Sequence, residues 1–409
     1  MSSPERLHAL DAVRAFALLL GVVLHAAMSF VPGMATQGFP IIDNSPSVGL
    51  GIVFYVIHIF RMTTFFVIAG FFARLVLHRK GTAAFIQDRS RRILLPLLVG
   101  WVACTVLIIL VMVWALCLNN GGQLPERMPG NGYVFSTTHL WFLYYLLWMY
   151  AIALLIRSVC ARIDPRGALG RALDRLLRWL MTSNLAPVAA AVPSALVLYA
   201  IDHWQIWGGI PTPDKSLIPE WPALIGYGIA FGLGWLLQRQ IELLRVWERR
   251  WLLNLGIALL LALVSLGIGT AFSEAGIATE GWRKATFAAI YALATWTWTA
   301  ALIGIGMRFC SNESPLRRYL ADASYWLYLA HLPLVFALQA AVMHADLHWS
   351  FKFPFILLTA CAVLLVSYHY WVRSTFIGAV LNGRKYPRSR AELPGKAHGA
   401  STSTDFRSP

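Results

Sequence analysis

Hydrophobic segments of about 20 residues recur along the whole chain, and short polar stretches separate them. A helix of this length crosses the bilayer core and satisfies all of its own backbone polar groups. The sequence therefore predicts an all-α integral membrane protein, a bundle of about ten transmembrane helices. The predicted spans cover residues 9–31, 48–77, 93–116, 138–156, 185–203, 220–238, 251–271, 285–307, 322–342 and 354–377.

Composition and charge support this topology. Of the 409 residues, 58% are hydrophobic and 13% charged, which leaves too little polar surface for a soluble protein. Lysine and arginine gather in the even-numbered connections and at both ends, so both termini are predicted to be cytoplasmic. The topology explains the net charge of +15, and nucleic-acid binding is not expected. The odd-numbered connections hold only Arg127, Lys215, Arg283, Lys284 and Lys352.

The chain is predicted to contain one structured domain. Residues 1–377 form the transmembrane domain, and the polar, Gly-, Pro- and Ser-rich residues 378–409 form a disordered cytoplasmic tail. The longest connection, residues 157–184, is rich in arginine and suits a helix on the membrane surface. The five cysteines lack ligand spacing, so neither disulfides nor a metal site is expected.

The first predicted span carries two ionisable residues, Arg14 and His25. Such a group at membrane depth costs from about 2.5 to well over 10 kcal/mol, which makes it a functional candidate. Eleven residues correspond to three helical turns plus about 20°, so both side chains lie on one face, roughly 16 Å apart. A neutral imidazole can take the proton of a hydroxyl group as a general base. The structural alternative for His25 is a hydrogen bond between helices.

The second span contains His58 and Arg61, which are neighbours on one helix face. A guanidinium stays protonated and suits an acidic acyl group or a thioester carbonyl. Alternatively, Arg61 pairs with Asp11 or with a backbone carbonyl and only fixes the packing of the helices.

Three further positions are candidates. Arg89 and Arg92, just before the third span, can present two forked guanidiniums to phosphate oxygens, although such pairs also serve as membrane anchors. His139 begins the fourth span and His331 lies within the ninth. Each of these histidines could contact a substrate or be a packing residue.

Several of these motifs together resemble the membrane acyltransferase-3 family. They are the arginine, ten intervening residues and histidine of the first span, followed by Arg89-x-x-Arg92 before the third. More narrowly, FYVIHIFRMTTFFVIAGFF, RRILLPLLVGW, HLWFLYYLL and ASYWLYLAHLPL are similar to the branch that succinylates osmoregulated periplasmic glucans. The resemblance implies a multi-pass protein of the bacterial inner membrane, a cytoplasmic acyl-CoA donor and a glycan acceptor on the periplasmic side. It makes Arg14 and His25 catalytic and assigns Arg89 and Arg92 to the donor.

The expected reaction is transfer of an acyl group, succinyl from succinyl-CoA, to a glucan hydroxyl, without a metal. His25 acts as general base or carries the acyl group, and Arg61 or Arg14 stabilises the succinyl carboxylate or the oxyanion. His58, His139 and His331 are assigned to the substrate. The alternatives are an O-acetyltransferase of another cell-surface polysaccharide, or a secondary transporter, against which the lack of paired broken helices argues. Membrane lipid is an expected partner, and a homo-oligomer stays an open alternative.

Overall fold

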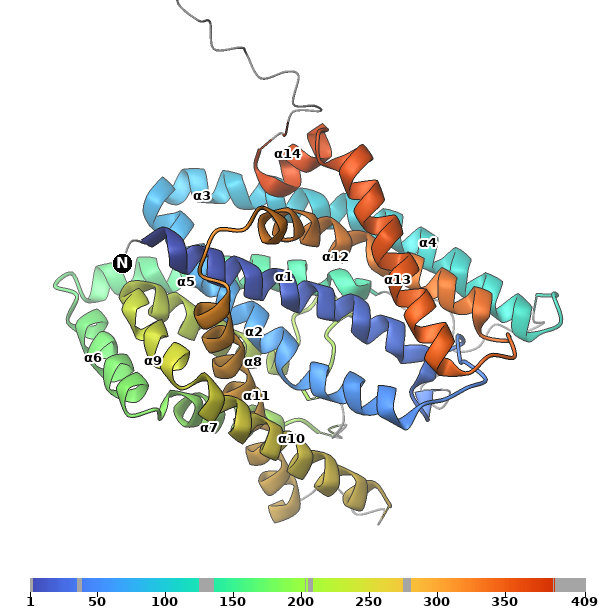
Figure 1. Cartoon of the computed structure of the whole chain (residues 1–409). Helices are drawn as coiled ribbons and strands as arrows, with labels where there is room; N and C mark the ends of the chain where they lie inside the picture. Colours follow the sequence, from blue (N-terminus) through green and yellow to red (C-terminus); the bar gives the residue numbers. More distant parts are fainter. Residues whose placement is uncertain are drawn as a thin grey trace, which may run out of the picture.

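The computed structural model describes residues 3–34, 39–124, 136–202, 204, 209–274, 281–384 and 386, and its regular structure within these ranges is entirely helical. The predicted all-α, multi-span membrane fold is thereby confirmed (Figure 1). The principal helices are α1 (Ser3–Ala27), α2 (Val48–Lys80), α3 (Thr82–Arg89), α4 (Leu95–Asn119), α5 (Trp141–Ile163), α6 (Ala168–Thr182), α7 (Ala186–Tyr199), α8 (Trp221–Leu237), α9 (Leu244–Arg249), α10 (Trp251–Glu274), α11 (Gly281–Phe309), α12 (Pro315–Val342), α13 (Trp349–Ser367) and α14 (Phe376–Asn382).

Eight helical stretches of the described residues are long and apolar enough to cross a membrane, and they match eight of the predicted spans. The other two predictions, 185–203 and 220–238, correspond to the shorter helices α7 and α8. With 14 and 17 residues, these reach only about 21 and 26 Å. α7 follows α6 after a bend of 109°, and the two together give a ninth candidate span.

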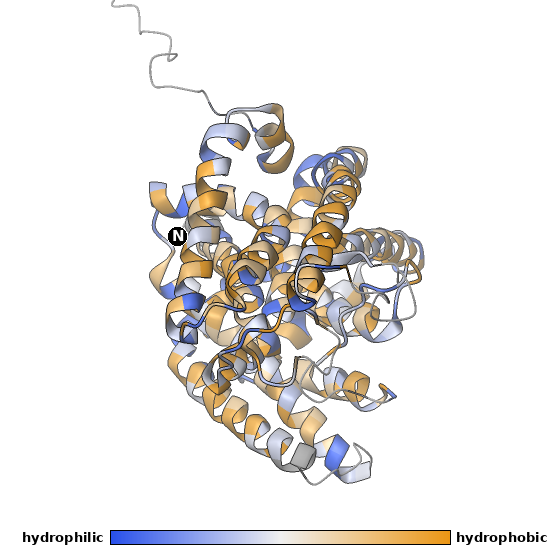
Figure 2. Ribbon diagram, turned by 90° about the vertical axis from the view of Figure 1, so that its right-hand side faces the viewer, coloured by the Kyte–Doolittle hydropathy of each residue, from blue (hydrophilic) through white to orange (hydrophobic). Residues whose placement is uncertain are grey.

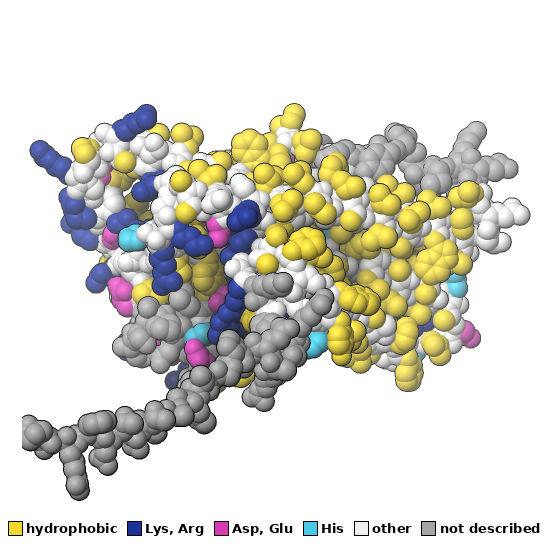
Figure 3. Space-filling model, turned by 90° about the horizontal axis from the view of Figure 1, so that it is seen from above, with side chains coloured by type: hydrophobic (Ala, Val, Ile, Leu, Met, Phe, Trp, Pro, Cys, Tyr) yellow, Lys and Arg dark blue, Asp and Glu magenta, His cyan; other side chains and the backbone are white. Residues whose placement is uncertain are grey.

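The helices differ in how much of their surface other helices cover. In α11, 67% of the most apolar 18-residue stretch is buried inside the bundle, against 22% of that in the α3–α4 span. The outward side of α4 is instead lined by exposed apolar residues such as Leu98, Val102 and Leu110, which suits contact with lipid. Figure 2 shows that hydrophobic residues dominate the helices, and Figure 3 shows lysine and arginine gathered toward one end of the molecule. We call this the arginine-rich end.

The predicted surface segment contains α6. Asp164 precedes this helix and accepts hydrogen bonds from the backbone N–H groups of Ala168 (2.9 Å) and Leu169 (2.6 Å). These bonds lower the pKa of the Asp164 carboxyl below its ordinary value and cap the start of the helix. The rest of the predicted segment, up to Ile163, continues α5.

The chain turns back on itself after α13. Residues 376–382 form α14, and its Leu381 is buried, so the first residues of the predicted tail belong to the folded domain. The remainder of that tail lies outside the described residues, apart from Gly383, Arg384 and Tyr386.

A buried ion pair anchors the other end of α13. Lys352 is 2% exposed, and its Nζ lies 3.0 Å from Asp43 Oδ1 and 2.6 Å from Asn44 Oδ1. The sequence predicted Lys352 to lie in a connection, but it belongs to the start of α13. The pair ties the segment before α2 to this helix.

Two glycines allow α2 and α8 to pack backbone to backbone. A Cβ atom at Gly70 would lie 2.0 Å from the carbonyl oxygen of Phe231, and one at Gly234 would lie 1.8 Å from that of Val67. Because no flexible side chain can move aside, only glycine fits at this crossing.

We therefore expect Gly234→Ala to push α2 and α8 apart and to destabilise the fold by roughly 1–3 kcal/mol. Thermal unfolding of the detergent-purified protein measures the loss. Gly232→Ala is the matched control, since its Cβ would meet nothing within 4 Å. Equal melting temperatures for the two variants would contradict the assignment.

Candidate active site

A cavity of about 160 Å³ at the arginine-rich end brings together three of the predicted arginines, Arg14, Arg89 and Arg92. They come from α1, α3 and the π-helical turn Ser90–Leu94 that joins α3 to α4. Beside them the lining is largely aromatic, with Phe65, Phe72, Phe142, Tyr150, Tyr325 and Tyr328. We call this space the basic cavity.

Contacts from several helices hold Arg89 and Arg92 in place. Arg89 lies over the rings of Phe85 (5.2 Å) and Tyr150 (5.4 Å) and 3.3 Å from an oxygen of Asp88. The Nη2 of Arg92 donates to the carbonyl oxygen of Leu381 (3.1 Å), which belongs to α14. Wide π-helical turns within helices are frequent at functional sites. Because Leu381 and Asn382 also line the basic cavity, α14 closes one side of it.

Arg14 lies at the rim of this cavity. Its Nη2 is 3.0 Å from Asp11 Oδ1, one turn earlier in α1, and its side chain is 39% exposed. Asp11 thus pairs with Arg14, whereas the sequence had offered it as a partner of Arg61. A wider cavity of about 440 Å³ shares Arg14 with the basic cavity and extends it outward. That outer cavity adds His8, Arg317, Arg318 and Arg384 to the lining.

Deeper in the bundle, three histidines form one cluster. The ring centroids of His25 and His331 are 5.2 Å apart, and those of His331 and His139 are 5.0 Å apart. They come from α1, α12 and the turn before α5, which are far apart in the sequence. Gln339 of α12 donates to the carbonyl oxygen of His25 (2.8 Å) and so holds α1 against α12.

The hydrogen bonds distinguish the three rings. The Nε2 of His139 lies 3.1 Å from the carbonyl oxygen of Leu329, which can only accept, so this nitrogen carries the proton. Its Nδ1 contacts the hydroxyl of Thr138, which has a positive φ of 52°. A β-branched residue in that conformation is strained, which is typical of functional sites. Both nitrogens of His139 are therefore occupied.

The other two rings keep an open nitrogen. The Nδ1 of His331 donates to the carbonyl oxygen of Tyr328 (2.7 Å), so the lone pair resides on Nε2. This Nε2 is buried and has no partner among the described residues. Nor does the buried Nδ1 of His25. Two imidazoles in contact thus each retain a nitrogen without a hydrogen-bond partner among the described residues.

Arg61 lies beside this cluster, outside the lining of the basic cavity. A Cβ atom at Gly21, one turn before His25, would be 2.5 Å from Arg61 Nη1. Among the described residues, the buried Nε of Arg61 has no hydrogen-bond partner, and no carboxylate forms an ion pair with this guanidinium. An uncompensated buried charge is costly, so the position favours an anionic ligand.

His58 faces another small space. It lines a cavity of about 30 Å³ with Tyr227, Tyr291 and Thr295, and its Nδ1 has no hydrogen-bond partner within the part of the chain that the structure describes. The structure therefore places His58 one turn from Arg61 but apart from the histidine contacts described above.

Tyr325 and Tyr328 connect the two parts of the site, and sequence analysis missed them. Both line the basic cavity, and the ring of Tyr328 lies 6.3 Å from that of His331. Tyr328 also donates to the carbonyl oxygen of His139 (2.8 Å). The signal was present in the three-residue spacing of Tyr325, Tyr328 and His331, which puts them on one helix face. His25 itself does not line the cavity, which ends near Leu18 and Tyr328.

Comparisons with known proteins give the family of this chain. Residues 7–371 match the family described as an acyltransferase domain, so the chain belongs to the acyltransferase-3 family. It is a multi-pass membrane acyltransferase. Two relatives are the glucans biosynthesis protein C sequences of Escherichia coli strains E24377A (O139:H28) and SMS-3-5. Each is 21% identical over 373 residues, which cover 89% of this chain and 92% of the relative. No solved structure is significantly similar to the chain.

Proposed function

We propose that this acyltransferase moves a succinyl group from cytoplasmic succinyl-CoA to a hydroxyl of a glucan on the periplasmic side of the inner membrane. The name of its relatives supports a glucan acceptor. The observation that carries the proposal is the position of Tyr328, which lines the cavity of the three arginines and also lies against His331, one of the two imidazoles in contact. An anionic donor and an alcohol can meet there without either leaving its own compartment.

The donor occupies the basic cavity. Forked guanidiniums suit phosphate oxygens, so Arg89 and Arg92 bind the diphosphate of coenzyme A, while the outer cavity with Arg317 and Arg318 accepts the rest of the nucleotide. The pantetheine arm then runs past the rings of Tyr325 and Tyr328. Because the cavity ends near Tyr328, this side chain moves aside when the thioester reaches His25.

At the histidine cluster, His25 takes the proton of the glucan hydroxyl, and the oxygen attacks the thioester carbon. The carbon–sulfur bond then breaks, and the thiolate recovers the proton from the His25 imidazolium. His331 Nε2 accepts a hydrogen bond from a second hydroxyl of the sugar, which positions the acceptor. Arg61, a buried cation without a carboxylate partner, binds the free carboxylate of the succinyl group.

The proposed roles of the three histidines predict a different loss of activity for each substitution. His25→Ala removes the base and should lower turnover by about 10²- to 10⁴-fold. His331→Asn keeps a donor for Tyr328 O but loses the Nε2 lone pair, so it should raise KM for the acceptor while the fold persists. His139→Gln keeps its donor to Leu329 O and should retain most activity.

Mass spectrometry of glucans from cells that express each variant gives the degree of succinylation, and melting temperatures of the purified variants report on the fold. Unchanged succinylation in His25→Ala would remove this residue from the chemistry. A stronger loss in His139→Gln than in His331→Asn would contradict the tautomer argument.

The donor site makes a separate prediction. Arg89→Ala with Arg92→Ala should raise the apparent KM for acyl-CoA at least about tenfold, since a hydrogen bond to a charged group contributes roughly 1.5–3 kcal/mol. Arg91→Ala is the control, because Arg91 is exposed and lines neither cavity. An unaltered KM in the double variant would exclude phosphate binding there.

A comparison of two donors tests which acyl group the protein transfers. We expect the purified wild type to consume succinyl-CoA in preference to acetyl-CoA, and Arg61→Met to lose this preference by about tenfold or more while it still folds. Thermal unfolding checks that the variant is intact. If acetyl-CoA is the better donor for the wild type, the protein is an O-acetyltransferase and the succinyl assignment is wrong.

A further inference from the structure

A second and larger cavity lies on the side of the bundle, between α2, α5, α6 and α8. Its volume is about 550 Å³, and it shares no lining residue with the basic cavity. Apolar side chains form most of its wall, and some of them, such as Ile156 and Leu169, are exposed at the surface. We call this space the lateral groove.

Glycines leave open space along α8 in the lateral groove. A Cβ atom at Gly232 would meet nothing within 4 Å, and one at Gly228 would meet only Met149, at 3.8 Å. These glycines therefore differ from Gly234 of the same helix, which α2 contacts. The groove has room for an extended apolar chain beside α8.

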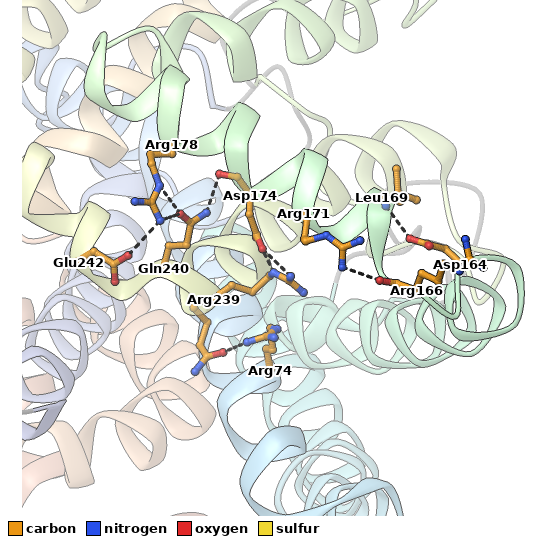
Figure 4. Close-up of polar contacts among 11 residues, drawn as sticks. Arg74, Asp164, Arg166, Leu169, Arg171, Asp174, Arg178, Arg239, Gln240 and Glu242 are labelled. Carbon is orange, nitrogen blue, oxygen red and sulfur yellow. Dashed lines mark hydrogen bonds and ion pairs between the residues drawn. The ribbon is translucent and has the colours of Figure 1, made fainter.

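The end of the groove nearest α6 is polar and positively charged. Arg74, His78, Arg157 and Arg239 line it, together with Asp164. Arg239 is neutralised by two hydrogen bonds of 2.6 Å to Asp174 (Figure 4).

Asp164 is also engaged, because it caps α6. Arg74 donates to the amide oxygen of Gln238, and Arg157 donates to the hydroxyl of Thr82 (3.3 Å). Two guanidiniums at this end therefore lack a carboxylate partner among the described residues.

The helix beside the groove has the pattern of a helix that lies in the membrane interface. The apolar residues Leu169, Leu173, Leu176 and Trp179 of α6 are exposed, whereas Leu177 and Met181 pack on the bundle. The other positions of α6 include three arginines, and such helices bury their apolar face at the level of the lipid headgroups. The basic end of the groove thus lies at headgroup level, and its apolar part extends toward the bilayer core.

We propose that the lateral groove binds an anionic phospholipid from the leaflet at the arginine-rich end. Its phosphate contacts Arg74 and Arg157, and one acyl chain lies along Gly228 and Gly232. Basic pockets between membrane helices recognise anionic headgroups in this way. The proposal is independent of the acyl donor, because a different set of residues lines the basic cavity.

The test uses the full chain in nanodiscs of phosphatidylcholine with phosphatidylglycerol, followed by native mass spectrometry of the lipids that stay bound. We expect the wild type to retain phosphatidylglycerol preferentially. Arg74→Ala with Arg157→Ala should lower this preference about tenfold, and Gly232→Leu should remove the bound lipid by filling the groove.

Two matched variants serve as controls. Arg162→Ala with Arg175→Ala removes two exposed arginines that do not line the groove, and Gly256→Leu adds a side chain where α10 has open space. Both should retain lipid as the wild type does. Equal retention of the two lipids by the wild type, or undiminished retention by Gly232→Leu, would overturn the proposal. Binding of coenzyme A, measured on the same samples, should be unchanged in every variant.

Discussion

The contact between α1 and α12 is the constraint on which the site depends. Gln339 hydrogen-bonds to the last carbonyls of α1, those of His25 (2.8 Å) and Ala26 (3.1 Å), and so satisfies acceptors that a helix end leaves open. Along the same interface the rings of His25 and His331 touch, and farther toward the arginine-rich end Arg14 and Tyr325 line one cavity. One pair of packed helices thus carries residues of both the basic cavity and the histidine cluster.

Charge compensation differs between the arginines of the basic cavity and the arginine beside the histidines. At the rim Arg14 is paired with Asp11, and Arg89 contacts Asp88, so neither needs a ligand in order to be stable. Arg61, next to His25, has no carboxylate partner in the described parts of the chain. Electrostatic interactions strengthen as the effective dielectric constant falls, so an anion gains most from the cation that is buried deepest. Of the three arginines, Arg61 therefore gains most from an anionic ligand.

The basic cavity and the lateral groove differ in the chemistry of their walls. Aromatic rings surround the arginines of the basic cavity, which suits a ligand with a planar, phosphate-bearing head. The lateral groove combines an apolar wall and open glycines with a basic rim, which suits a lipid. Basic residues alone therefore do not define a donor site in this protein, because their neighbours determine which anion fits.

The sequence by itself determined the features that depend on local periodicity. Long apolar runs predicted the spanning helices, the eleven-residue spacing of Arg14 and His25 predicted a common face of α1, and the Arg89-x-x-Arg92 motif predicted a basic site. It could not foresee that α7 and α8 are short, or that Arg61 lies with the histidines, because both depend on packing between distant segments. Only the tertiary structure brought His25, His139 and His331 into one cluster and left two of them with open nitrogens. Helical periodicity determines which residues share a face of one helix. The partners of a side chain depend instead on packing against helices that lie hundreds of residues away in the sequence.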